Sequence, residues 1–588
     1  FNRKIYLKKE FNETKYDKID PEKDFNNFEE KVNQLCEKKD FQLSPHQMFV
    51  RNFLSFETPY NSLLLYHGLG TGKTCSSISI TEEMRDYLKQ VNIRKKIIIV
   101  ASPVVQENYK IQLFDERKLK KVGDVWDIKS CVGNSLIKEI NPIQSKISRE
   151  TVVSKIKKLI KKWYIFMGYT KFSNYINSLM NKYGISDDDN IEQQKKKKLL
   201  IKKEFSNRLI VIDEVQNIRT NKKMKKSSNN FLELVKYTLN LKLILLTATP
   251  MYNDPEEIVW LLNLMNINDK RVPISVSDVF DKNSELIVGN NDEQIGKELL
   301  ERKMRGYVSY VRGENPFTFP NAIYPNDYED PQSLKQLLNT EWIYPSKQMN
   351  GLEIQNGIQH LDLLLTNIGS EQKDMYEFII KKLKSKYPVL KEARQGIQYT
   401  VVDAPLQLLN FAYPHKDMTT ENKNNIIPKE LYGKSGLNRI MSYDDKRKKN
   451  YTYKSETLKN FGRVFSQEHI QKYSGKIAKI LNTIQNSKGI VLIYSQFIDG
   501  GCVPIALALE EMGMKRYTDK LTLFKNNDSE PIDAVTMKKK SAMNEAGGER
   551  FYQAKYAMIT GDPSLSPNNK KELKACTEKE NINGEVVK

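Results

Sequence analysis

A glycine-rich segment links an apolar run to a helical stretch in the first part of the sequence. Residues 63–74 read LLLYHGLGTGKT, so three glycines precede Lys73 and Thr74. Glycines let the backbone turn so that several N–H groups face one anion, and the following helix points the positive end of its dipole there. The segment predicts a phosphate-binding loop, in which Lys73 reaches the terminal phosphates and Thr74 holds Mg²⁺. The strict pattern has glycine where His67 stands, and a chance glycine-rich turn is the alternative.

Two adjacent carboxylates follow a second apolar run. The segment NRLIVIDEVQNI places Asp213 and Glu214 at the end of a predicted strand. Because the carboxyl ends of parallel strands share one edge of a sheet, we expect this pair beside the phosphate loop. There, Asp213 would bind Mg²⁺ through water, and Glu214 would orient or deprotonate an attacking water molecule. Alone, such a pair is often only a polar strand end, but together with the loop it predicts nucleoside triphosphate hydrolysis.

Two threonines end a third apolar run. The segment LILLTATP places Thr247 and Thr249 where the predicted strand stops. Hydroxyl groups at this position can sense the terminal phosphate and pass its presence to neighbouring loops. Thr-Pro is also an ordinary strand terminator, so a coupling role depends on the first two motifs.

Short apolar runs alternate with helical stretches from about residue 41 to residue 268. This alternation predicts an α/β fold, a parallel sheet with helices on both faces. A second α/β pattern follows near Tyr473, with predicted strands at 489–497 and 556–560. The predicted order is an N-terminal lead-in, a nucleotide-binding lobe, a mixed and largely helical bridging region and a partial second lobe, over residues 1–40, 41–268, 269–470 and 471–588.

The composition indicates a globular chain with an excess of positive charge. Its 94 Lys and Arg residues against 73 Asp and Glu residues give a net charge of +21 at pH 7. A phosphate-binding surface and a lysine-rich proteome explain this excess about equally well. The lysine-rich runs at 195–203 and 222–226 are interpreted as solvated insertions rather than as contacts with a nucleic acid.

The cysteines and histidines show no ligand spacing. No pair of the five cysteines has a metal or redox separation, so we expect free thiols and a reducing, intracellular compartment. The five histidines are not clustered either, and no structural metal is expected. The cysteines are Cys36, Cys75, Cys131, Cys502 and Cys576.

The three motifs, in this order, resemble those of superfamily 2 helicases and translocases. TATPMYNDPEEIVWLLNLM (247–265) resembles the Swi/Snf-like branch, while GYVSYVRGENPFTFP (306–320) and VLIYSQFIDGGCVPIALALEEMG (491–513) are similar to helicase-like transcription proteins of large nucleocytoplasmic DNA viruses. These include the poxvirus early transcription factor small subunit and the poxvirus nucleoside triphosphate phosphohydrolase. The resemblance covers roughly residues 41–320 and 471–588. It implies two RecA-like lobes, the second of them incomplete, and ATP and Mg²⁺ as cofactors.

The resemblance also assigns roles to single residues. FQLSPHQ places a glutamine where the family has one that reads adenine, so the implied ATP site comprises Gln47, Gly70, Thr71, Gly72, Lys73 and Thr74. IIIVASPVVQENY and YIFMGYTKF resemble loops that touch the nucleic-acid backbone, through Ser102, Pro103, Gln106, Asn108 and Thr170.

The implied function is that of an ATP-dependent nucleic-acid translocase or helicase. It would act with a viral RNA polymerase or another transcription factor subunit, in early promoter initiation or transcript release. DNA is favoured over RNA as the track, and no membrane partner is expected. The alternative is a transcription factor subunit that uses the helicase-like core mainly to bind a promoter or a polymerase. A viral protein of this kind would act in the host cytoplasm and the virion.

The family's second lobe also contributes an arginine to the ATP site. No arginine follows Thr560 in this sequence. We therefore expect residues 1–588 alone to bind ATP but to turn it over poorly, with the arginine supplied beyond Lys588 or by a partner.

Overall fold

The computed structural model divides the chain into two compact units, Phe1–Asn321 and Ala322–Lys588. It describes residues 2–16 and 42–567, together with a few residues in 17–41, a few in the longer gaps, and residues 569 and 572. The gaps are at 56–57, 69, 144, 186–190, 219–224, 252–253, 283, 290–292, 312–328, 339, 341, 348–362, 387–398, 444–448, 518–521 and 546–549.

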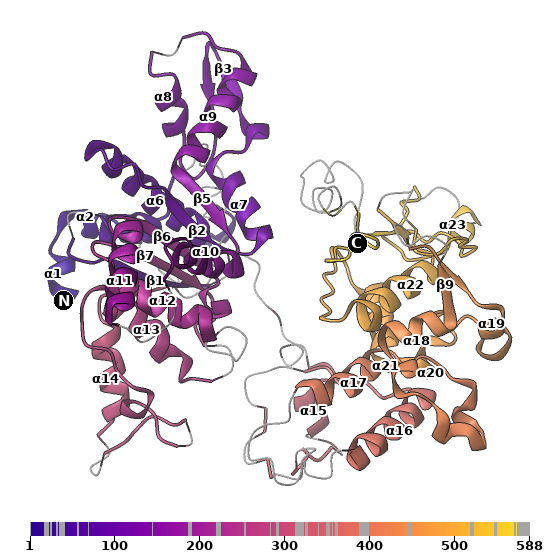
Figure 1. Cartoon of the computed structure of the whole chain (residues 1–588). Coiled ribbons are helices and arrows are strands. Elements are labelled where there is room, and N and C mark those ends of the chain that lie inside the picture. The colour runs from indigo at the N-terminus through magenta and orange to yellow at the C-terminus, as the bar shows by residue number, and fades with distance from the viewer. Residues whose placement is uncertain are drawn as a thin grey trace. The chain divides into compact units, whose positions relative to one another are not determined.

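A six-stranded parallel sheet forms the centre of the first unit (Figure 1). Its strand order is β5-β2-β6-β7-β1-β8, and every neighbouring pair is parallel. Because all strands run in one direction, the residues that follow them gather along one edge of the sheet. The strands are β1 (Ser62–His67), β2 (Ile97–Val100), β5 (Tyr164–Met167), β6 (Leu209–Asp213), β7 (Lys242–Thr247) and β8 (Val308–Val311).

Helices cover both faces of this sheet, which confirms the predicted α/β fold. Side chains alternate along each strand, so Leu63 and Leu65 enter one core and Leu64 enters the other. The first core contains residues of α5 (Pro45–Phe53), α6 (Lys73–Gln90) and α7 (Pro103–Leu113). The second contains residues of α10 (Tyr169–Lys182), α11 (Ile191–Phe205), α12 (Lys225–Tyr237), α13 (Glu257–Asn268) and α14 (Ile295–Met304).

Strand β8 is the outermost strand of the sheet, beside β1, although its residues fall within the predicted bridging region. Its register with β1 runs from Leu64↔Val308 to His67↔Val311. The run VSYV is only four residues long and half polar, so it does not stand out in the sequence. Residues 312–320 of the viral-like segment lie outside the described residues.

A small subdomain is inserted between α7 and β5 (Figure 1). It has a hydrophobic core of its own, which includes Phe114, Val152 and Ile156. Its elements are the antiparallel pair β3 (Lys120–Val122) and β4 (Val125–Asp127), and the helices α8 (Ser135–Ile140) and α9 (Arg149–Trp163).

The lysine-rich run at 195–203 lies in α11. This helix buries Ile201 and Phe205 in the core of the first unit, while Lys195 and Lys196 are exposed. Residues 222–224 of the second lysine-rich run lie outside the described residues.

The second unit is mainly helical and packs around a single core. In the part that the structure describes, its parallel pairing consists of β11 (Lys515–Arg516) with β12 (Lys555–Tyr556) and one isolated bridge between Tyr451 and Phe524. An antiparallel pair is formed by β9 (Met441–Tyr443) and β10 (Tyr451–Tyr453). The helices are α15 (Leu334–Leu338), α16 (Ser370–Lys386), α17 (Tyr399–Asn410), α18 (Gly433–Ile440), α19 (Ser455–Phe461), α20 (Ile470–Tyr473), α21 (Gly475–Asn486), α22 (Val503–Glu511) and α23 (Lys540–Glu545).

The prediction of a buried strand at 489–497 is wrong. The segment forms no ladder with any described strand. Ile490, Leu492 and Tyr494 are exposed, whereas Val491 and Ile493 pack against the core of the unit. An apolar run forms a buried parallel strand only where strands flank it and both of its faces are covered. Here only one face is covered.

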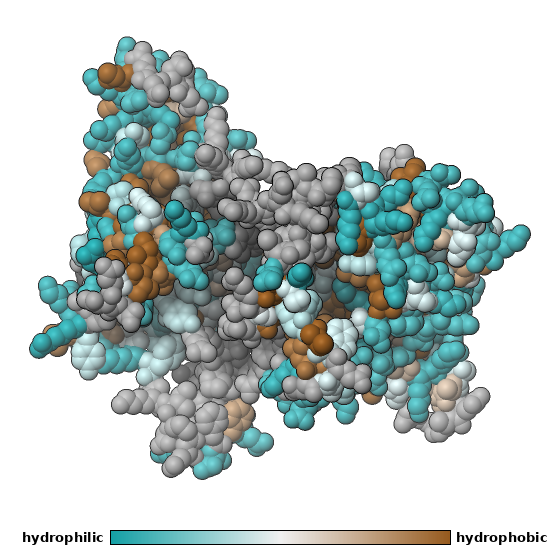
Figure 2. Space-filling model, turned by 90° about the horizontal axis from the view of Figure 1, so that it is seen from below, coloured by the Kyte–Doolittle hydropathy of each residue, from teal (hydrophilic) through white to brown (hydrophobic). Residues whose placement is uncertain are grey.

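Within the described residues, every helix is too short or too polar to span a bilayer. On the face that Figure 2 shows, hydrophobic residues form small groups among hydrophilic ones.

Candidate active site

The phosphate loop lies between the end of β1 and the start of α6. Gly70 and Gly72 have φ angles of 79° and 78°, a left-handed backbone conformation that residues with a Cβ rarely adopt. Gly72 is the residue that precedes the first turn of α6, so the N–H groups of that turn face the loop. The Lys73 ammonium group donates to the carbonyl oxygens of His67 (2.9 Å) and Gly68 (3.3 Å).

Helix α5 packs its first turn against the same loop. The Gln47 side chain accepts from the Ser44 N–H (2.9 Å) and donates to the carbonyl oxygens of Thr71 (3.5 Å) and Gly72 (3.3 Å). A Cβ at position 72 would displace the Gln47 amide from this contact, and the positive φ of Gly72 already favours glycine there. Gln47, which was predicted to read adenine, therefore contacts the backbone of the phosphate loop.

Asp213 is the last residue of β6 and is buried. Burial, reinforced by the charge of Glu214, raises the pKa of the Asp213 carboxyl to about 6. One carboxylate oxygen accepts from the Glu214 N–H (2.9 Å), and the other accepts no hydrogen bond from the described residues. A desolvated carboxylate with a free oxygen at the end of a strand is a suitable ligand for a divalent cation. The Thr74 hydroxyl, at the start of α6, is a second suitable ligand. These two residues would hold Mg²⁺.

A chain of hydrogen bonds joins the second motif to the third. The Glu214 carboxylate accepts from Gln216 Nε2 (2.7 Å), and Gln216 Oε1 accepts from the Thr247 hydroxyl (2.7 Å). The Thr247 oxygen in turn accepts from the Thr249 N–H (2.9 Å). Glu214 has a φ of 48°, a strained conformation for a residue that is not glycine. The position of its carboxylate is thus coupled directly to the ends of β6 and β7.

Two tyrosines pack around the carboxylate pair. Tyr169, at the start of α10, donates to the Asp213 carbonyl oxygen (2.8 Å), which links the predicted nucleic-acid loop after β5 to the second motif. Tyr109 of α7 is fully buried and hydrogen-bonds the Ser77 hydroxyl of α6. Burial raises the pKa of both tyrosine hydroxyls, so they remain protonated donors.

Comparison with known proteins identifies this arrangement. Residues 46–304, which include both nucleotide motifs and the coupling threonines, match the model of the SNF2-related domain. This part of the chain is an SNF2-related domain, as the resemblance to the Swi/Snf-like branch of superfamily 2 predicts. Its SNF2-related domain is of the ATPase and helicase-like type.

Relatives of this SNF2-related chain occur in large DNA viruses. A protein of Acanthamoeba polyphaga mimivirus, R563, which is named as an ATP-dependent RNA helicase, is 24% identical over 82% of this chain and 66% of its own length. Protein 087L of invertebrate iridescent virus 3, named as a helicase, is 20% identical over 95% of this chain and 45% of its own length. The chain thus spans less than two thirds of the length of these relatives.

This chain also has a match among solved structures. The SWI2/SNF2 ATPase core of Sulfolobus solfataricus, solved in complex with dsDNA, is 15% identical. The match covers 92% of this chain and 93% of that one, with a TM-score of 0.30.

The predicted nucleic-acid contacts of the SNF2-related domain lie at the same sheet edge as the ATP motifs. Ser102 lies between β2 and α7, Pro103 is the first residue of α7, and Thr170 lies in the first turn of α10 after β5. Pro103, Asn108 and Thr170 are exposed. The Gln106 amide nitrogen donates to the Ala101 carbonyl oxygen (2.7 Å), which ties this side chain to the end of β2.

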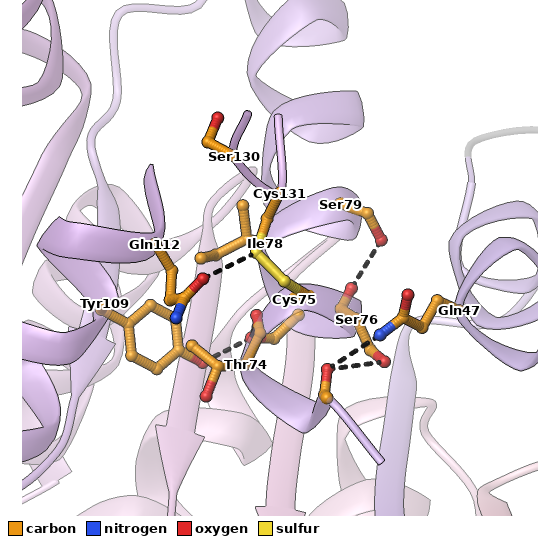
Figure 3. The surroundings of a disulfide bond; sticks show 12 residues. Gln47, Thr74, Cys75, Ser76, Ile78, Ser79, Tyr109, Gln112, Ser130 and Cys131 are labelled. Atoms are coloured by element: carbon orange, nitrogen blue, oxygen red, sulfur yellow. Dashed lines mark hydrogen bonds between the residues drawn. A yellow bond between two sulfur atoms is a disulfide. The ribbon is translucent and has the colours of Figure 1, made fainter. Parts of the chain in front are cut away.

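A disulfide bond lies beside the phosphate loop of the SNF2-related domain (Figure 3). It joins Cys75, in the first turn of α6, to Cys131, in the inserted subdomain, with a Cα–Cα distance of 5.4 Å. The prediction of free thiols is wrong for this pair, because residues 56 positions apart in the sequence become neighbours when the subdomain packs on α6. Cys502 is free. Cys36 and Cys576 lie outside the described residues.

Several residues of the SNF2-related domain that contact the site were not predicted from the sequence. Gln216 could have been found, because it lies two positions after Glu214 in DEVQ. Tyr169 lies within a loop that was recognised, next to the predicted Thr170. His46, which hydrogen-bonds the phosphate loop, gave no signal, because a single histidine in a helix is usually structural.

Proposed function

We propose that the chain is a motor subunit that hydrolyses ATP with Mg²⁺ and moves along duplex nucleic acid. The observation that carries this proposal is the hydrogen-bonded chain from Glu214 through Gln216 to Thr247, at the sheet edge that also holds the phosphate loop. A domain that only binds a partner has no need of a carboxylate held in a strained conformation and connected to the neighbouring strand end.

Each residue of the site has a role in this chemistry. The backbone N–H groups of the first turn of α6 bind the terminal phosphates, and Lys73 leaves the carbonyl oxygens of His67 and Gly68 to neutralise their charge. Mg²⁺ held by Thr74 and Asp213 would neutralise the remaining phosphate charge. Glu214 orients the attacking water and accepts its proton.

The hydrogen-bonded chain supports a coupling mechanism. When Glu214 turns toward the water, the Gln216 amide loses the carboxylate to which it donates. Because Gln216 also accepts from the Thr247 hydroxyl, its movement is passed to the end of β7. Tyr169 connects the Asp213 backbone to the loop after β5. A change at the terminal phosphate thereby reaches the loops proposed to contact the nucleic acid.

We propose that the track is contacted through its phosphates rather than its bases. The loops that carry Ser102 to Asn108 and Gly168 to Lys171 present exposed polar groups and helix N-termini at the sheet edge, which suit phosphate oxygens. Binding should be weakly sequence-specific and should weaken steeply as the salt concentration rises.

The finer assignment is a DNA-dependent ATPase that serves viral transcription, in initiation or transcript release, in the host cytoplasm and the virion. The similarity to helicase-like transcription proteins of large DNA viruses and the viral relatives support this assignment. RNA is the rival track, because R563 is named as an RNA helicase.

The test is the ATPase rate of the full-length protein with duplex DNA, single-stranded DNA and RNA of matched length. We expect the largest stimulation by duplex DNA and none by Lys73→Ala protein with any nucleic acid. Stimulation by RNA alone would reassign the track, and a rate without response to any nucleic acid would contradict a motor function.

A further inference from the structure

A histidine outside the predicted ATP site contacts the phosphate loop. His46 is the second residue of α5, and its Nε2 atom lies 2.9 Å from the carbonyl oxygen of Thr71. On the other side of the ring, Nδ1 is hydrogen-bonded to the hydroxyl of Tyr16, which comes from the N-terminal lead-in. The two rings are stacked at an angle of 16°. His46 therefore lies between a tyrosine of the lead-in and the backbone of the loop.

The partners of His46 select one tautomer. A carbonyl oxygen only accepts, so Nε2 must carry a proton and donate to Thr71. Burial lowers the pKa of His46, which favours the neutral ring, and in a neutral ring the other nitrogen accepts. The Tyr16 hydroxyl is then the donor to Nδ1. Both nitrogens are satisfied in this single arrangement, from Tyr16 through His46 to Thr71.

The hydrogen bond to Thr71 fixes the orientation of a peptide group. In a trans peptide the carbonyl bond and the following N–H bond point in opposite directions. With the Thr71 oxygen held toward His46, the Gly72 N–H is directed to the opposite side, into the loop. Gln47 also donates to the next carbonyl, that of Gly72 (3.3 Å), which the first turn of α6 already holds through the Ser76 N–H (3.0 Å). Adjacent residues of α5 thus contact consecutive carbonyl groups of the loop.

This peptide group needs an external constraint. It lies between Gly70 and Gly72, both with positive φ, and glycine restricts its own backbone less than any other residue. The loop's own side-chain bond, from the Thr71 hydroxyl to the Gly68 carbonyl oxygen (2.8 Å), leaves the Thr71 carbonyl free to rotate. The contacts from α5 supply the missing constraint.

The His46 ring is itself held in place. It packs edge to face on His67, with ring centroids 5.5 Å apart and an angle of 82°. His67 is buried at the end of β1, and its Nε2 atom hydrogen-bonds the Ser309 hydroxyl of β8 (2.9 Å). Burial lowers the pKa of His67 to about 3, so this neighbour stays neutral and does not repel its partner.

We infer that His46 is a positioning residue for the phosphate loop, which aims the Gly72 N–H at the nucleotide phosphates and is kept in the required tautomer by Tyr16. This inference rests on the proposed ATP-binding function. It assigns to the lead-in, through Tyr16, a part in nucleotide affinity. The role concerns phosphate binding only, and recognition of the base is separate from it.

The test is the affinity of the full-length protein for ATP, ADP and AMP, measured by fluorescence or calorimetry with Mg²⁺ present. In His46→Leu protein we expect affinity for ATP and ADP to fall about five- to tenfold, as for loss of one hydrogen bond to a backbone carbonyl. Affinity for AMP should stay within about twofold, since its single phosphate lies away from the Gly72 N–H. In His46→Gln protein the amide can still donate to Thr71, and it should restore most of the ATP affinity.

Controls keep the inference separate from folding and from the proposed function. Tyr16→Phe should lower the affinity for ATP and ADP by about two- to threefold and leave the affinity for AMP unchanged. Tyr183→Phe, a change at an exposed tyrosine, should have no effect on any of the three. Folded His46→Leu protein with unchanged ATP affinity, or with an equal loss for AMP, would overturn the inference. If His46→Leu does not fold, the same criterion applies to Tyr16→Phe. A wild-type protein that binds no ATP would instead overturn the proposed function.

Discussion

Strand β7 of the first unit and the segment 489–497 of the second unit are similar in sequence but not in structure. KLILLT and GIVLIYSQF are both short, strongly apolar runs. β7 pairs with β1 and β6 and is buried along its whole length. The segment 489–497 pairs with no described strand, and Leu492 is 93% exposed. Apolar composition therefore predicts the ability to form a buried strand, and the neighbours decide whether one forms.

The comparison has a consequence for stability. Leu245 of β7 is completely buried, whereas Leu492 is almost completely exposed. Leu245→Ala should destabilise the first unit by about 2–5 kcal/mol, because it removes buried methyl groups and leaves a cavity. Leu492→Ala should change the stability of the second unit by less than about 0.5 kcal/mol. Urea unfolding followed by hydrogen exchange, which reports each unit separately, measures both. Equal effects would mean that residues 489–497 are buried in solution.

The two units also differ in their cysteines. Cys75 and Cys131 are cross-linked in the first unit, and Cys502 is free in the second. Reduction, or Cys75→Ser, should lower the stability of the first unit by about 2–4 kcal/mol and leave the second unchanged. Cys502→Ser is the matched control. Peptide mapping under non-reducing conditions should recover the Cys75–Cys131 pair, and its absence would contradict the assignment.

We expect the general base of ATP hydrolysis to be Glu214 of the first unit, with no base supplied by the second unit. Glu214→Gln should retain ATP binding but lower the hydrolysis rate of the full-length protein about a hundredfold or more, since the amide cannot accept the proton of the water. Glu421→Gln, an exposed position in the second unit, should leave the rate unchanged. Wild-type hydrolysis by Glu214→Gln protein would show that another residue is the base.

The raised pKa of Asp213 predicts a pH dependence. Its pKa is about 6 rather than 3.8, so the carboxylate that we propose binds Mg²⁺ is ionised above pH 6 and becomes protonated as the pH falls below it. Hydrolysis should therefore decline up to about tenfold per pH unit on the acid side. Because Mg²⁺ binds the ionised form, a higher Mg²⁺ concentration should shift this acid limb to lower pH. An acid limb that does not respond to Mg²⁺ would belong to another group.

The sequence was sufficient for the parts of the fold that are locally encoded. Long apolar runs bounded by helices predicted the central strands of the first sheet, and the ATP motifs predicted which strand ends meet. β8 was missed because its four residues are half polar, and its place in the sheet depends on pairing with β1. The Cys75–Cys131 contact was missed because it depends on how the inserted subdomain packs. Non-local packing decided both cases.

The site shows the same limit. Lys73, Asp213 and Glu214 belong to motifs whose spacing is informative, and the structure brings them to one sheet edge. Their supporting residues come from separate elements and have no characteristic spacing. Gln216 and His46 were recognised only through the atoms that they hydrogen-bond.

Hydrogen bonds connect the edge strand β8 to the start of the phosphate loop. The Gly68 N–H donates to the carbonyl oxygen of Val311 (3.1 Å), and Ser309 hydrogen-bonds His67. Val311 is the last residue of β8 and Ser309 lies two positions before it, so the outermost strand holds the start of the loop at two points. A displacement of Gly68 during nucleotide exchange must either move Val311 or break this bond. The loop and β8 are therefore expected to move together.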